Sequence, residues 1–235
     1  MKIVIAMIAL LFCNTLYAET ARELNTQGFR LYKQQRYVEA LALFKKATIV
    51  NPKYALGFYN AASTLGVLHK KSVCQYDAYK EIINKYLKKS VQLDPRRSQR
   101  MRTDPDLQPV HDTFIYQRLL GLRLNSSTDV QKILKRVSWY GQANGVIGPE
   151  SRIYFEPRGK VILQLLSLGD RDLEIKDEIA RYEVRGGRIS VFRKDKSGRE
   201  IVVYGELKPN GELHFDKNMP SQLRILTDDS GNCSS

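Results

Sequence analysis

The fold of the N-terminal half is decided by residues 21–52, ARELNTQGFRLYKQQRYVEALALFKKATIVNP. Apolar residues recur there at spacings of three and four in two sets, separated by a polar Gln-Gln-Arg turn, and this spacing places each set on one face of a helix. Thr20 followed by Glu23 predicts a capping box at the first helix. Asn51-Pro52 predicts the end of the second, because proline lacks an amide hydrogen and restricts the preceding residue. The stretch therefore predicts an antiparallel helical hairpin.

Small and aromatic residues in this hairpin follow a further pattern, carried by Gly28, Ala40, Phe44, Ala47 and Pro52. Their spacing resembles that of the tetratricopeptide repeat, a unit of about 34 residues. Leu24 stands where that family often has tryptophan, and Leu31 where it often has tyrosine. The resemblance implies pairs of antiparallel helices that stack into an α-solenoid.

A second, less regular unit follows. Its first-helix positions hold Phe58, Ala61, Ala62 and Leu65, and its closing Pro95 comes late. Apolar residues keep helical spacing through residues 73–93, which predicts one lengthened helix. Residues 104–109 are rich in turn formers, and residues 110–122 predict a closing helix similar to those that end many tetratricopeptide arrays.

The apolar pattern changes period after Val137. Runs of β-branched and aromatic residues flank glycine-containing turns and predict three hairpins, at residues 153–163, 182–191 and 203–215. With a first strand near Trp139 they predict about eight strands in an antiparallel barrel or sandwich. The segment resembles the lipocalin-like meander of bacterial envelope proteins through Trp139, Phe155 with Gly159, and Tyr182 before Gly186-Gly187.

The N-terminus predicts export. Met1-Lys2 precedes ten apolar residues, and Leu16-Tyr17-Ala18 provides a cleavage site, so residues 1–18 are expected to be a signal peptide. Phe12 is bulkier than the residue that usually precedes a lipidated cysteine, so we expect no lipid anchor at Cys13. Export combined with few cysteines favours a bacterial periplasm or cell envelope.

The expected fold class is therefore α+β, with the chain divided into five parts. They are a signal peptide (1–18), a helical domain of two helix pairs and a closing helix (19–123), a linker with a short helix (124–135), an antiparallel β domain (136–227) and a flexible tail (228–235).

The chain is strongly basic, with a formal net charge of +13. Residues 70–102 hold ten basic residues against three acids. An exported protein meets little nucleic acid, so this stretch favours an acidic protein or peptide partner, or peripheral contact with anionic lipid or glycan. A solvated helix face in a basic protein is the plainer interpretation.

Residue types with catalytic chemistry are sparse. His69, His111 and His214 fall in three different predicted elements, and neither Cys74 nor Cys233 forms a metal-binding pattern with them. Nucleophile-elbow, P-loop and dinucleotide-binding motifs are absent from the sequence. The sequence therefore predicts a binding protein without a catalytic site, cofactor or metal.

The resemblance to tetratricopeptide arrays implies a binding surface, since the first helix of each repeat lines a concave groove in that family. The residues implied are Arg22, Asn25, Phe29, Tyr32, Lys33, Leu56, Tyr59 and Ser63. Aromatic rings beside basic and amide groups suit an extended peptide. The family's carboxylate clamp is not expected, because Asn25 and Phe29 differ from it. The alternative function is a small-molecule or lipid carrier, in which the β domain encloses a cavity.

Overall fold

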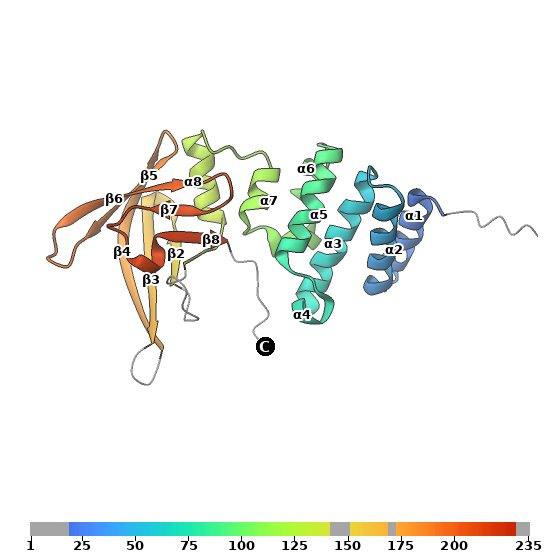
Figure 1. Ribbon diagram of the computed structural model, residues 1–235, viewed down its shortest axis with the longest axis horizontal. Helices are drawn as coiled ribbons and strands as arrows, with labels where there is room; N and C mark the ends of the chain where they lie inside the picture. The colour runs from blue at the N-terminus through green and yellow to red at the C-terminus, as the bar shows by residue number, and fades with distance from the viewer. Residues whose placement is uncertain (1–18, 142–150, 169–172, 229–235) are drawn as a thin grey trace, which may run out of the picture.

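The computed structural model describes residues 19–141, 151–168 and 173–228, which form a helical half and a β-barrel half. The two halves lie end to end along the longest axis of the molecule, with α7 and α8 between them (Figure 1). The predicted signal peptide lies outside the described residues. So does the predicted tail, apart from its first residue.

The helical half begins with two antiparallel pairs, α1 with α2 and α3 with α5. The helices of the described chain are α1 (Ala21–Lys33), α2 (Tyr37–Val50), α3 (Ala55–Lys71), α4 (Val73–Tyr76), α5 (Lys80–Leu93), α6 (Arg97–Met101), the 3-10 helix η1 (Pro105–Val110), α7 (Phe114–Leu119) and α8 (Ser127–Arg136). The predicted capping box is present, since the Thr20 hydroxyl accepts from the Glu23 amide and the Glu23 carboxylate accepts from Thr20. At Gly28, an added Cβ would lie 2.8 Å from the Phe44 ring, so the small residue lets the first pair pack closely.

Two helix predictions were wrong in their boundaries. The helix expected over residues 73–93 is broken: α4 ends at Tyr76, Asp77 follows with a left-handed φ of 50°, and α5 begins at Lys80. The closing helix expected over residues 110–122 is shortened to α7, because the Thr113 side chain accepts from the Tyr116 amide and caps a new start. The short helix expected within residues 124–135 is present as α8, and the Ser126 side chain caps it by accepting from the Asp129 amide.

The β half is a closed antiparallel barrel of eight strands, which decides between the predicted barrel and sandwich. The strands are β1 (Trp139–Gly141), β2 (Ser151–Phe155), β3 (Lys160–Leu168), β4 (Leu173–Arg185), β5 (Arg188–Lys194), β6 (Glu200–Leu207), β7 (Leu213–Phe215) and β8 (Ile225–Asp228). Each strand pairs with the next, and β8 pairs with β1 to close the barrel, for example Trp139 with Asp228. The predicted glycine turn between β4 and β5 is present, with positive φ at Gly186 and Gly187.

The prediction that residue 228 belongs to a flexible tail was wrong. Asp228 is the last residue of β8, and its carboxylate accepts a 2.8 Å hydrogen bond from the amide of Phe114 at the start of α7. This bond ties the end of the barrel chain to the helical half.

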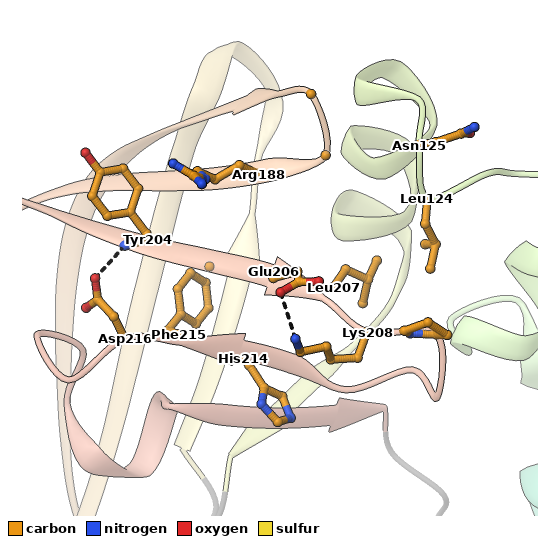
Figure 2. Close-up of a pocket in the computed structure, with 14 residues that line it drawn as sticks. Leu124, Asn125, Arg188, Tyr204, Glu206, Leu207, Lys208, His214, Phe215 and Asp216 are labelled. Atoms are coloured by element: carbon orange, nitrogen blue, oxygen red, sulfur yellow. Dashed lines mark hydrogen bonds and ion pairs between the residues drawn. The ribbon is translucent and has the colours of Figure 1, made fainter.

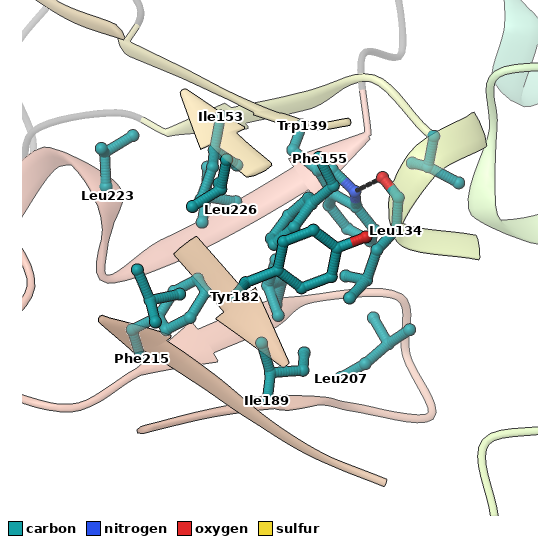
Figure 3. Close-up of a cluster of buried hydrophobic side chains, with 14 of the residues drawn as sticks. Leu134, Trp139, Ile153, Phe155, Tyr182, Ile189, Leu207, Phe215, Leu223 and Leu226 are labelled. Carbon is teal, nitrogen blue, oxygen red and sulfur yellow. Dashed lines mark hydrogen bonds between the residues drawn. The ribbon is translucent and has the colours of Figure 1, made fainter. Parts of the chain in front are cut away.

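The barrel interior is filled by large side chains. Trp139, Phe155, Tyr182 and Phe215 are buried among aliphatic residues from all sides of the barrel (Figure 3). Leu134 of α8 joins this core, and its carbonyl accepts from the Trp139 indole N–H at 3.1 Å, so α8 packs against one end of the barrel.

Contacts between the halves are both apolar and polar. The ring of Phe114 belongs to the barrel core, although α7 belongs to the helical half. Asp112 accepts from Lys80 of α5 at 2.9 Å and from the Ser138 hydroxyl at 3.1 Å, and its backbone carbonyl accepts from the Ser138 amide. The halves therefore share a core and a network of hydrogen bonds.

Candidate functional site

The helical half has a concave pocket of about 200 Å³ between α1, α3 and the segment that runs from α6 into η1. The segment approaches α3 closely at Gly66, where an added Cβ would lie 1.9 Å from the carbonyl oxygen of Asp106. Real Cβ atoms essentially never come within 3.0 Å of such an atom, so only glycine permits this contact. Gly66 was not identified from the sequence.

Two carboxylates of this segment point into the concave face. Asp104 accepts hydrogen bonds from the hydroxyls of Tyr59 at 2.8 Å and Ser63 at 3.1 Å. Asp106 accepts from the hydroxyl of Tyr32. Burial and the neighbouring carboxylates hold the pKa of both tyrosines well above its usual value, so both remain neutral donors at physiological pH. The chain's own acidic segment thus occupies part of the predicted groove.

The structure divides the eight predicted groove residues into two groups. Asn25, Tyr59 and Ser63 are buried; Tyr59 and Ser63 are bonded to Asp104, and Asn25 accepts from the Asn60 amide at 2.8 Å. These three positions are not open to a partner, because their polar groups are already engaged within the chain. The others are exposed or half-buried: Arg22, Phe29, Tyr32, Lys33 and Leu56.

The open part of the face is centred on Phe29, whose side chain is 47% exposed. Its ring is parallel to that of Tyr32, with centroids 6.4 Å apart, and the Lys33 ammonium lies 5.4 Å from its centroid. Across the pocket, the Arg100 guanidinium lies 5.9 Å from the Tyr59 centroid. The open face therefore combines an accessible ring with basic groups on its rim.

Sequence reasoning missed Arg100 and the two aspartates. The Asp104-Pro105-Asp106 triplet was interpreted only as a turn. A signal was present, since two acids around a proline form a short acidic segment directly after the basic stretch that ends with Arg100 and Arg102. What the sequence could not show is that this segment lies against tyrosines of two earlier helices.

The basic stretch of residues 70–102 is partly used inside the molecule. Lys70 donates to the carbonyl of Pro105 at 2.7 Å, and Lys80 pairs with Asp112. Arg96 and Arg97 both pair with Asp94. Lys88 and Lys89 on α5 are exposed. The stretch is therefore not one continuous free surface.

A pocket of about 850 Å³ opens in the β half, where the loop at Leu124 and Asn125 faces strands β5 to β7 (Figure 2). Some of its polar groups have partners within the chain. Lys208 pairs with Glu206 at 2.7 Å, and the Asp216 carboxylate accepts from the Tyr204 amide at 3.0 Å. The Arg188 guanidinium, which also lines the pocket, lies 5.7 Å from the centroid of the Tyr204 ring.

Metal binding has no support in the described residues, 19–141, 151–168 and 173–228, since no three His, Cys, Asp or Glu side chains gather there as metal ligands. Within those same ranges, no helix has both the length and the apolar composition needed to cross a bilayer.

Comparison with known proteins gives no independent guide to the site. No protein-family model matches the chain, and no curated protein matches it. The site is therefore interpreted from its own geometry.

Proposed function

We propose that this protein is an exported protein–protein interaction module, in which a tetratricopeptide-like α-solenoid binds an acidic partner segment on its concave face. The proposal places the partner on the open part of that face, over Phe29, with Arg22, Lys33 and Arg100 at the rim. The close antiparallel pairing of α1 with α2 at Gly28 supports the solenoid interpretation. Periplasm or cell envelope is the proposed location.

One observation carries the proposal: the concave face already holds an acidic segment. Tyr32, Tyr59 and Ser63 donate to the carboxylates of Asp104 and Asp106. Hydrogen bonds to charged acceptors are each worth about 1.5–3 kcal/mol when measured by mutation. The face therefore accommodates an acidic Asp-Pro-Asp segment of its own chain. Because its hydroxyl donors are engaged there, a partner segment would bind beside it, through the open groups at Phe29, Lys33 and Arg100.

The open part of the face offers a partner two things, apolar area and positive charge. The ring of Phe29 offers apolar area at the centre, and a ring at the centre of an interface can cost about 2 kcal/mol when truncated. The basic side chains of the rim should mainly speed association with an acidic partner and make it sensitive to salt.

The alternative function, a carrier that uses the barrel cavity, has less support. The interior positions are filled by Trp139, Phe155, Tyr182 and Phe215, and α8 packs against one end (Figure 3). Eight-stranded barrels either pack their interior solid or hold one small ligand, and these side chains favour solid packing. We propose instead that the barrel anchors the helical half through Phe114 and Asp112.

The proposal can be tested by photo-crosslinking in the native host. A photoreactive phenylalanine analogue would replace Phe29 in one variant and Ile49 in a control. Ile49 is 77% exposed on α2 and does not line the pocket. We expect position 29 to capture a discrete partner whose crosslinked peptide is rich in Asp and Glu. Equal labelling at both positions, or crosslinks to neutral peptides only, would show that the concave face is not the binding surface.

A further inference from the structure

A second cleft, separate from the concave pocket, lies where the helical half meets α8. Its volume is about 440 Å³, within the range of small-molecule sites. Arg102 lines it from just after α6, and Arg136 from the last position of α8. His111 and Gln117, whose positions in the sequence fall between the two arginines, also line the cleft. We call it the arginine cleft.

The two guanidinium groups of the arginine cleft are oriented by neutral partners. Arg102 donates one N–H to the Leu120 carbonyl at 2.8 Å. Arg136 donates one to the Gln117 side-chain oxygen at 3.2 Å, and Gln117 in turn donates to the His111 carbonyl at 2.6 Å. A guanidinium has five N–H donors, so each arginine keeps several that these bonds do not use. Among the described residues, neither arginine forms an ion pair with a carboxylate.

The one acid in the wall does not neutralise these arginines. Asp112 lines the cleft, but its carboxylate accepts from Lys80 at 2.9 and 3.1 Å and from Ser138 at 3.1 Å. The charge of Lys80 balances that of Asp112. The two arginines therefore leave the cleft positively charged.

The imidazole of His111 adds a further group. Its Nε2 atom is buried and has no hydrogen-bond partner within the described part of the chain. Leaving a buried polar atom unpaired is costly, and such an atom next to a cleft marks a position where a ligand atom would be favourable. The His111 ring is held against Tyr116, with centroids 4.7 Å apart, and the Tyr116 hydroxyl donates to the Met101 carbonyl.

We propose that the arginine cleft binds the phosphate or carboxylate group of a small ligand. Planar guanidinium groups form paired hydrogen bonds with such oxyanions, and these charge-assisted bonds are among the strongest that proteins make. The ligand would touch Arg102 of the helical half and Arg136 of the helix that packs on the barrel. Its binding therefore fastens the two halves together.

Isothermal titration calorimetry on residues 19–235 tests this proposal. The probes are inorganic phosphate in one arm and succinate in the other, both at constant ionic strength. Arg102→Gln and Arg136→Gln are the test variants. Arg118→Gln is the matched control, because Arg118 is exposed on the neighbouring α7, donates to the Leu122 carbonyl and does not line the cleft. Circular dichroism checks that each variant is folded. A further variant, Arg136→Lys, keeps the positive charge but removes the planar guanidinium that can donate two parallel hydrogen bonds.

We expect each cleft variant to weaken binding of the preferred probe about 10-fold or more, while the control changes it by less than about 2-fold. Arg136→Lys should fall between Arg136→Gln and the natural protein. Tighter phosphate binding would assign a phosphorylated ligand, and tighter succinate binding a carboxylate ligand. If neither probe binds the natural protein, or if all variants bind equally because the site holds an adventitious ion only, the proposal is overturned.

Discussion

Replacing Gly66 by alanine tests whether the acidic segment is packed on α3 as described. The added methyl would lie 1.9 Å from the Asp106 carbonyl oxygen, so the backbone of the segment has to move by more than about 1 Å to reach the shortest contacts that real Cβ atoms make. That movement weakens the bonds from Tyr59 and Ser63 to Asp104 and from Tyr32 to Asp106.

The expected loss can be estimated from these bonds. Each hydrogen bond to a charged group contributes about 1.5–3 kcal/mol, and some will re-form after the shift. Alanine in a helix interior is favoured over glycine by about 1 kcal/mol, which offsets part of the loss. We therefore expect a net destabilisation of about 2–4 kcal/mol, or a fall in Tm of roughly 4–16 °C for a chain of this size.

Gly57→Ala is the matched control for this experiment. Gly57 lies on the same helix, and an added Cβ there meets only side chains, the nearest being the Tyr54 ring at 3.2 Å. Urea denaturation followed by far-UV circular dichroism gives both free energies of unfolding. We expect Gly57→Ala to stay within about 1 kcal/mol of the natural protein. If Gly66→Ala is as stable as Gly57→Ala, the segment is not held against α3 and the reasoning is refuted.

Three further predictions concern the junction and the cysteines. Phe114→Ala should cost about 3–5 kcal/mol, because its ring is buried in the barrel core against Gly211; a loss below about 1 kcal/mol in urea would contradict the shared core. Burial raises the pKa of Asp228, so its contribution to stability falls as pH rises from the usual aspartate value, about 3.9, through the raised folded value. Asp228→Asn should remove that slope, and parallel pH profiles for variant and natural protein would oppose it. Cys74 is disulfide-bonded. A non-reducing peptide map should therefore show its peptide linked to a second cysteine peptide, whereas a free Cys74 thiol would contradict this.

Much of the fold could be predicted from local patterns in the sequence. The first helix pair follows from apolar spacing, the Thr20 cap and the small Gly28. The strands follow from β-branched runs and glycine turns. Closure of the barrel could not be predicted, because it depends on β8 pairing with β1 across almost the whole domain. The break at Asp77 was missed, because helical spacing continues across it and an aspartate can adopt a left-handed conformation.

The candidate site was predictable only in part. The tetratricopeptide resemblance implied Phe29 and Lys33 as groove residues, and both are exposed. They could not show that Tyr59 and Ser63 are covered, because the covering residue, Asp104, is more than 40 positions away in sequence. Such long-range side-chain contacts leave no periodic signal. The arginine cleft could not be predicted for the same reason, since Arg102 follows α6 whereas Arg136 ends α8.

Binding of a partner over Phe29 is measured most directly by quantitative pull-down from envelope extract of the native host. The baits are the natural protein, Phe29→Ala and Ile49→Ala. Truncating a central ring costs about 2 kcal/mol, which corresponds to roughly 30-fold weaker binding, seen mainly as faster dissociation. We predict that Phe29→Ala loses an acidic partner that Ile49→Ala retains. Recovery of the same partner at the same strength by all three baits would contradict binding on the concave face.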